Sequence, residues 1–100
     1  MRATGGLRTF SGAVAVITGG ASGIGRALAK ELATRDCEVV LADLQVELAQ
    51  KVASDICASG GRAAAMQADV TDYTALERVV HQTVQRAGRL DYMFNNAGIV

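Results

Sequence analysis

Four short apolar runs alternate with three segments of helical periodicity, and this alternation limits the possible folds more than any other feature of the sequence. A short apolar run with little polar alternation is typical of a strand that is buried on both faces. A parallel sheet with a helix in each crossover satisfies the pattern. The runs cover residues 13–18, 38–43, 62–69 and 90–95.

The three segments between the runs have the apolar periodicity of amphipathic helices. The first extends to about residue 34, the second closes at glycines 60 and 61, and the third ends at Gly88 after capping signals in residues 71–77. The predicted inward stripes are Ile24, Ala27, Leu28 and Leu32 in the first helix; Leu44, Leu48, Val52 and Ile56, with Ala49 and Ala53 beside them, in the second; and Leu76, Val79, Val80, Thr83, Val84 and Ala87 in the third.

The run at 62–69 is rich in alanine, so propensity alone favours a helix there. Its flanking glycines and polar residues leave only the length of a strand. The order is then β-α-β-α-β-α-β with short connections, which predicts right-handed crossovers and the doubly wound strand order 3-2-1-4. The expected fold is an α/β, Rossmann-type parallel sheet over residues 13–100, after a flexible segment at residues 1–12.

Charge and composition exclude several classes of partner. Ten basic and ten acidic residues are interspersed and give no net charge, so the chain lacks the basic surface that a nucleic acid requires. The longest apolar run, residues 13–17, is far short of the roughly 20 residues that span a bilayer. Cys37 and Cys57 are too few for a disulfide framework or a metal site. We expect both to be buried thiols in a reducing compartment.

A glycine-rich turn joins the first run to the first helix, in Thr18-Gly19-Gly20-Ala21-Ser22-Gly23-Ile24-Gly25. Without Cβ atoms, such a turn lets the backbone approach a pyrophosphate, which the amides and the positive end of the helix dipole then face. The alternative is a flexible turn with no ligand, because a glycine motif alone is weak.

Asp43 ends the second run about twenty residues further on, where a carboxylate can accept hydrogen bonds from an adenosine ribose. On its own it could instead cap the next helix. Its negative charge would repel the 2′-phosphate that distinguishes NADP from NAD. Ser22 adds no cation before Gly23, although Arg26 is near in sequence. These residues favour NAD over NADP.

Two further polar groups follow the third and fourth runs. Asp69 could accept from an adenine amino group while Val70 lies against the ring, or Asp69 could cap the next helix. The side-chain amides of Asn95 and Asn96 could tie adjacent strand ends together and receive the ribose beside the nicotinamide, or mark a simple turn.

Together these four groups resemble the short-chain dehydrogenase/reductase family, and the resemblance covers nearly the whole chain. It implies an oxidoreductase that moves hydride between a nicotinamide cofactor and an alcohol or carbonyl, commonly as a homodimer or homotetramer in the cytosol. The cofactor-binding residues that it implies are Thr18, Gly19, Ala21, Ser22, Gly23, Ile24, Gly25, Asp43, Leu44, Asp69, Val70, Asn95, Asn96, Ala97 and Gly98.

The sequence departs from the family in its acid–base residues. Members use a Ser and a Tyr-x-x-x-Lys pair beyond the Asn-Asn-Ala-Gly turn, and the chain ends two residues after that turn. Tyr73 and Tyr92 are followed four residues later by Glu77 and Asn96, so neither has the lysine that would lower the pKa of its phenol. We therefore expect no catalytic residue in this chain and no activity from it alone. Lys30, Lys51 and His81 are expected on the surface.

The expected molecule is an incomplete doubly wound fold, the cofactor-binding portion of an enzyme. Its fourth strand lacks an outer neighbour, which predicts weak stability or self-association through that edge. One alternative is a module that holds a dinucleotide without turnover. Another is a methyltransferase-like sheet, but such sheets generally carry an acid just before the glycines, where this sequence has Thr18.

Overall fold

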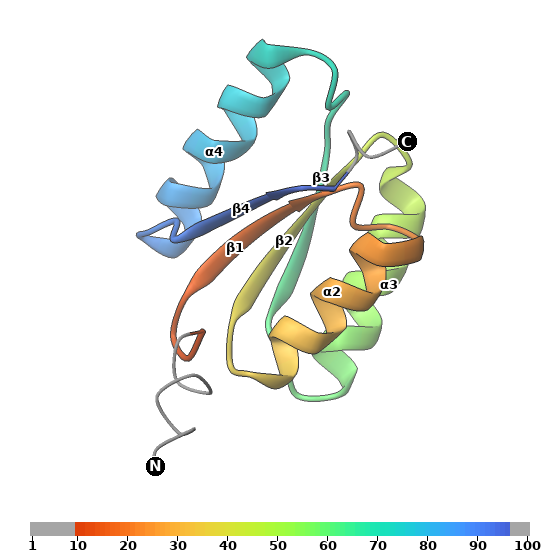
Figure 1. Cartoon of the computed structure of the whole chain (residues 1–100), viewed down its shortest axis with the longest axis vertical. Helices are drawn as coiled ribbons and strands as arrows, with labels where there is room; N and C mark the ends of the chain where they lie inside the picture. Colours follow the sequence, from red (N-terminus) through yellow and green to blue (C-terminus); the bar gives the residue numbers. More distant parts are fainter. Residues whose placement is uncertain (1–9, 97–100) are drawn as a thin grey trace.

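The computed structural model describes residues 10–96, which form four parallel strands alternating with three helices (Figure 1). The strands lie in the order β3-β2-β1-β4. The predicted α/β class and strand order are therefore confirmed. The elements are β1 (Val14–Thr18), α2 (Gly23–Thr34), β2 (Glu38–Asp43), α3 (Val46–Ala58), β3 (Ala63–Gln67), α4 (Tyr73–Ala87) and β4 (Tyr92–Asn95).

The sheet is covered by α2 and α3 on one face and by α4 on the other (Figure 1). Ile17 and Leu41 point into the core beneath α2 and α3, whereas Val16 and Val40 point into the core beneath α4. All four side chains are fully buried. The central strands β1 and β2 are thus buried on both faces, which explains their continuous apolar sequences.

The predicted inward stripes are correct in part: Leu32, Ala49, Val52, Ala53, Ile56, Val79 and Thr83 are buried, whereas Ala27 is exposed. Ile24 is 69% exposed, and Leu44, Leu48 and Val84 are also exposed. The residues against the sheet are often the small ones, because a helix with glycine or alanine at the contact approaches the strands more closely. The larger apolar residues are displaced to the sides. The buried residues are Gly25, Ala29 and Leu32 in α2; Ala49, Val52, Ala53 and Ile56 in α3; and Ala75, Val79 and Thr83 in α4.

The two cysteines lie in different environments. Cys37 is buried, as predicted, and burial raises the pKa of its thiol to about 11. Cys57 is exposed, so the prediction of a second buried thiol is wrong. It follows the buried Ile56 by one residue, and a step of about 100° around a helix turns it away from the core.

Residues 10–12, which precede the predicted domain, contact the rest of the described chain. The ring centroids of Phe10 and Tyr92 are 5.1 Å apart, and Gly12 donates its N–H to the Asp36 carbonyl at 2.9 Å. Residues 1–9 lie outside the described residues.

Lys30, Lys51 and His81 are exposed, as predicted. Between residues 10 and 96, no helix is long and apolar enough to cross a bilayer.

Asp91 fastens the beginning of β4 to the beginning of β1. One carboxylate oxygen accepts the Val14 N–H at 2.8 Å, and Arg89 donates to both oxygens at 2.8 and 2.7 Å. The hydrogen bonds from Arg89, followed by that from the Val14 backbone, hold the pKa of the Asp91 carboxyl below its usual value. The ionised carboxylate is therefore the form that stabilises this edge of the sheet.

Replacing Asp91 with Asn is expected to lower the melting temperature at neutral pH. The melting temperature of the variant should also fall less than that of wild type as the pH is lowered. A carboxyl with a lowered folded-state pKa stabilises the fold above about pH 4, and that stabilisation is lost as the pH falls through the lowered pKa. Melting curves from pH 7 to pH 2 should separate wild type from the variant at neutral pH and converge in acid.

The matched control is Asp55→Asn in the last turn of α3, where a negative charge faces exposed carbonyls and contributes no favourable helix-dipole interaction. This control should melt no earlier than wild type at neutral pH. Parallel curves for wild type and Asp91→Asn at every pH would contradict the role of the Asp91 carboxylate.

Candidate functional site

The predicted site residues meet at the carboxyl ends of β1, β2 and β4. The first two crossovers run from β1 through β2 to β3, and β4 returns to the other side of β1 (Figure 1). This reversal makes a switch point between β1 and β4, where doubly wound sheets bind their ligands. The glycine-rich turn leaves β1 at this point.

The turn requires glycine for two reasons. Gly19 and Gly23 have φ angles of 66° and 59°, in the left-handed region that favours glycine. Gly25 is required for space, because a Cβ there would collide with the Gly19 carbonyl oxygen and lie 2.7 Å from Nδ2 of Asn96. The start of α2 is therefore packed directly against the turn.

Gly20 is a further constrained position that sequence reasoning missed. A Cβ at this residue would lie 2.8 Å from Cδ2 of Leu41 and 3.2 Å from the carbonyl oxygen of Ile17. The available signal was its place in the Gly19-Gly20 pair directly after a buried strand. Because only a hydrogen fits there, the turn can lie close over the end of the sheet.

The first amides of α2 fit an anionic ligand. Ser22 occupies the N-cap position but makes no side-chain capping bond, and no acidic residue lies in the first turn. Ser22, Gly23 and Ile24 are exposed. A helix N-terminus with amides of this kind and a positive dipole end is suited to a phosphate.

Asp43 connects the glycine-rich turn to the end of β2. One carboxylate oxygen accepts the Ala21 N–H at 3.1 Å, and the other accepts the Gln45 N–H at 2.9 Å. A carboxylate has about four acceptor positions, so these two bonds leave capacity for a ligand hydroxyl. Asp43 is half-buried and directly precedes Leu44, whose side chain is 61% exposed. A polar acceptor and an apolar surface thus lie side by side.

Asp69 shapes the connection between β3 and α4. One of its oxygens accepts from the Thr71 hydroxyl at 2.6 Å and from the Thr71 N–H at 3.0 Å. These two bonds, the hydroxyl first, hold the pKa of the Asp69 carboxyl below its usual value. The N-cap of α4 is Asp72, which accepts the Thr74 N–H at 2.9 Å. Asp69 is therefore not the helix cap, while Val70 beside it is half-buried.

The end of β4 is tied to β1 by two side chains. The Thr18 hydroxyl donates to the Phe94 carbonyl at 3.3 Å, and Nδ2 of Asn96 donates to the Gly19 carbonyl at 3.2 Å. Asn96 therefore makes the tie between strand ends that was predicted for this pair of asparagines, and Asn95 is exposed. Ala97 and Gly98 lie outside the described residues.

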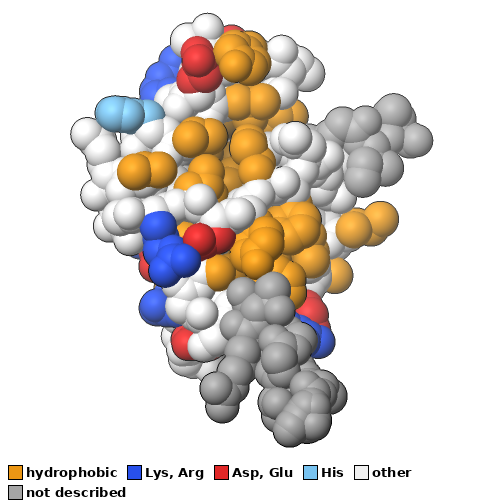
Figure 2. Space-filling model, turned by 60° about the vertical axis from the view of Figure 1, so that its left-hand side comes forward, with side chains coloured by type: hydrophobic (Ala, Val, Ile, Leu, Met, Phe, Trp, Pro, Cys, Tyr) orange, Lys and Arg blue, Asp and Glu red, His pale blue; other side chains and the backbone are white. Residues whose placement is uncertain are grey.

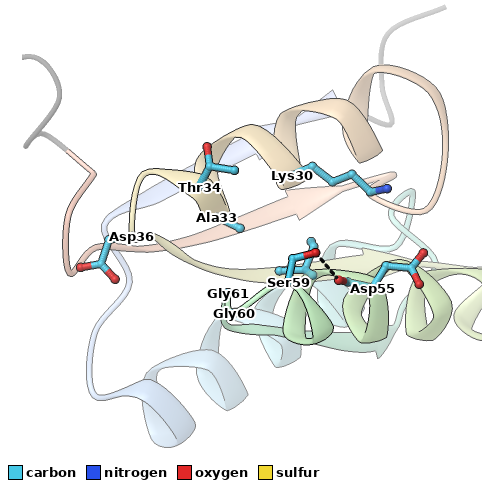
Figure 3. Close-up of a pocket in the computed structure, with 9 residues that line it drawn as sticks. Lys30, Ala33, Thr34, Asp36, Asp55, Ser59, Gly60 and Gly61 are labelled. Carbon is cyan, nitrogen blue, oxygen red and sulfur yellow. Dashed lines mark hydrogen bonds between the residues drawn. The ribbon is translucent and has the colours of Figure 1, made fainter.

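A different cavity, of about 610 Å³, lies between the C-terminal ends of α2 and α3 (Figure 3). Asp36 and Asp55 line it, together with Lys30. Helix C-termini and carboxylates disfavour an anion. This cavity is therefore poorly suited to a pyrophosphate, in contrast to the glycine-rich turn at the opposite end of α2.

Comparison with known proteins identifies the family of this chain. The family described as short chain dehydrogenase matches residues 13–100. Tropinone reductase-like 2 of Erythroxylum coca is 43% identical over 93 residues, which are 93% of this chain and 33% of that protein. Cyclohexanol dehydrogenase of an Acinetobacter species is 43% identical over 91 residues, 91% of this chain and 36% of that protein.

The fold has a similar relative among solved structures. The crystal structure of hydroxysteroid dehydrogenase from Escherichia coli superimposes with a TM-score of 0.88 at 34% identity, over 95% of this chain and 38% of that one. The chain thus spans about a third of the length of the relatives that it matches. Since the family match extends over residues 13–100, this chain belongs to the short chain dehydrogenase family.

Proposed function

We propose that this chain is the cofactor-binding portion of an NAD-dependent oxidoreductase that moves hydride between a nicotinamide and an alcohol or carbonyl. The observation that carries the proposal is the contact between the Asp43 carboxylate and the Ala21 amide, because it joins a carboxylate that could accept from a ribose to a turn that is suited to a phosphate. Members of the family bind nicotinamide dinucleotides, and the chemistry of these donors and acceptors fits such a group.

Each part of the dinucleotide has a partner in the chain. The pyrophosphate would lie against the first amides of α2, at residues 22–24, which are exposed and lack a side-chain acceptor. The adenosine ribose would donate to Asp43, and the adenine would lie between Leu44 and Val70 with Asp69 at its amino group. The side-chain amides of Asn95 and Asn96 would receive the nicotinamide ribose.

The bound cofactor supplies the hydride chemistry, while this chain binds and orients it. Thr18 and Asn96 hold the end of β4 against β1, so the two halves of the site keep a fixed separation. A Ser and a Tyr-x-x-x-Lys pair for proton transfer would come from sequence beyond Gly98. We propose that residues 1–100 alone bind the cofactor without turning it over.

Charge supports a preference for NAD. With the adenosine ribose bound at Asp43, a 2′-phosphate would face the Asp43 carboxylate, and like charges opposed across an interface cost several kcal/mol. Alcohol or carbonyl substrates are supported by the names of two relatives, a cyclohexanol dehydrogenase and a meso-2,3-butanediol dehydrogenase. A cytosolic location and a homo-oligomeric state remain part of the proposal, the first supported by the two free thiols.

Calorimetric titration of the 100-residue chain with NADH, NADPH and S-adenosylmethionine tests the proposal. NADH should bind at least about tenfold more tightly than NADPH, a difference of about 1.4 kcal/mol, and S-adenosylmethionine should not bind. The proposal would be overturned if a folded sample showed no binding of NADH at millimolar concentration. A panel of alcohols and ketones then distinguishes the enzyme from a purely binding module, because the module would show no turnover even when the chain is extended.

A further inference from the structure

The turn that leads from β3 into α4 holds the Asp69 carboxylate in one orientation. Oδ1 of Asp69 accepts the Thr71 hydroxyl at 2.6 Å and the Thr71 N–H at 3.0 Å. A hydroxyl that donates to a carboxylate at this distance makes a short, charge-assisted hydrogen bond. Because both bonds end on the same oxygen, they restrict rotation of the carboxylate and direct its other oxygen, Oδ2, away from Thr71.

The backbone of Asp69 is anchored on both sides. The Ala68 N–H donates to the Asp43 carbonyl at 3.2 Å, and the Asp72 N–H donates to the Asp69 carbonyl at 3.0 Å. Ala68 before the turn and Ala75 after it are both buried in the core beneath α4. Figure 2, in which the side of α4 comes forward, shows hydrophobic side chains gathered there. The position of Asp69 is therefore set before a ligand binds.

The hydrogen bond between Thr71 and Asp69 does not cap the helix. Asp72 occupies the N-cap position, where its side chain accepts the Thr74 N–H at 2.9 Å and its carbonyl accepts the Leu76 N–H at 3.1 Å. Asp69 and Thr71 are both exposed. An exposed carboxylate that is held in place without capping a helix is a preorganised acceptor, and preorganisation lowers the entropic cost of binding a ligand.

We propose that Thr71 is a positioning residue for the adenine base, and that this turn selects adenine over hypoxanthine. The inference rests on the proposed function, in which adenine lies beside Val70 with Asp69 at its amino group. An ionised carboxylate only accepts hydrogen bonds. Adenine presents a donor, its exocyclic amino group, whereas hypoxanthine has a carbonyl oxygen at the same ring position. Oδ2 of Asp69, directed by Thr71, would therefore bind adenine and repel hypoxanthine.

Calorimetric titration of the 100-residue chain with NADH and with reduced nicotinamide hypoxanthine dinucleotide tests this role, because the two probes differ only in the base. Wild type should bind NADH about tenfold more tightly, the scale of one hydrogen bond to a charged group. Thr71→Val replaces the hydroxyl with a methyl group, so the carboxylate can turn away from the base. The ratio of the two affinities should then fall to about threefold or less. Thr71→Ser keeps the hydroxyl and should restore the ratio.

The matched control is Thr74→Val, the same substitution at an exposed threonine in the first turn of α4. This control should keep the wild-type ratio, and all titrations are made below the melting temperature of every variant. A wild-type ratio in Thr71→Val, even with both affinities lowered, would make Thr71 a purely structural residue and overturn the inference.

The inference and the proposed function can fail separately. If wild type bound NADH but did not distinguish it from the hypoxanthine dinucleotide, the inference would be overturned while the proposed function stood. If wild type bound neither dinucleotide, both would be overturned. Asp69→Asn should lower the ratio as Thr71→Val does, because its side-chain NH₂ group can donate to the hypoxanthine carbonyl. An unchanged ratio in Asp69→Asn would place the base elsewhere and would also overturn the inference.

Discussion

Replacing Gly25 with Ala should weaken NADH binding by about 10- to 100-fold, the largest effect expected from a single methyl group in this chain. The added Cβ would collide with the Gly19 carbonyl oxygen and lie 2.7 Å from Nδ2 of Asn96. The Gly19 carbonyl is also the acceptor of the Asn96 amide. One methyl group would therefore displace the turn, the start of α2 and the tie to β4 together.

Gly60→Ala separates this effect from a general loss of stability. Gly60 has a φ angle of 93° and open space around its Cα, and it lies far from the turn, after the end of α3. Alanine there costs about 1–2 kcal/mol of backbone strain. Overpacking at Gly25 should cost stability on a similar scale, about 1–3 kcal/mol. NADH titrations of the two variants at a temperature where both are folded should show weakened binding only for Gly25→Ala. Equal affinities would mean that the turn does not hold the cofactor.

The sheet topology could be predicted from sequence because each strand carries its own signal. Residues 14–18 and 39–42 are buried on both faces and form nearly continuous apolar runs, and the doubly wound arrangement of such strands then gives the order 3-2-1-4. The alanine-rich β3 shows the same principle, since its flanking glycines outweighed the helix propensity of its residues.

The helix faces could be predicted only in part. Counting large apolar residues selected Ile24, Leu44 and Leu48, and all three are exposed. Part of the contact with the sheet is made by Gly25, Ala29 and Ala75, whose small size permits close approach but gives no signal in a hydrophobic stripe. Cys57 was wrongly predicted to be buried because the prediction followed residue type and not its position on α3, one residue after the inward-facing Ile56.

Within the site, sequence could name the residues but not their mutual contacts. The two interpretations of Asp43, ribose acceptor and local cap, are not exclusive, because its oxygens accept from the glycine-rich turn and from the β2–α3 connection at once. For Asp69 the contacts distinguish the roles, since Asp72 occupies the cap position. Such long-range pairings depend on the folded path of the backbone rather than on residue type or spacing.

The double attachment of Asp43 determines what its replacement should do. Asp43→Ala removes the proposed ribose acceptor, and the amides of Ala21 and Gln45 lose their shared hydrogen-bond partner. A hydrogen bond to a charged group contributes about 1.5–3 kcal/mol, so NADH affinity should fall by about 10- to 100-fold. The affinity for NADPH should fall less, because the negative charge that would repel its 2′-phosphate is removed at the same time.

Asp43→Asn distinguishes the charge from the attachment. The amide keeps one acceptor oxygen for one backbone N–H but places an NH₂ group against the other, and it carries no charge. With this variant the affinity for NADPH relative to NADH should rise, while one of the two backbone hydrogen bonds that Asp43 accepts is kept.

Asp72→Asn is the matched control, because asparagine caps a helix as well as aspartate does and Asp72 lies outside the proposed site. If calorimetric titration gave both Asp43 variants the wild-type ratio of NADH to NADPH affinity, the ribose would have to bind elsewhere. If Asp43→Ala lowered the affinity for NADH but Asp43→Asn kept the wild-type ratio of NADH to NADPH affinity, Asp43 would act through its hydrogen bond to the glycine-rich turn rather than through its charge.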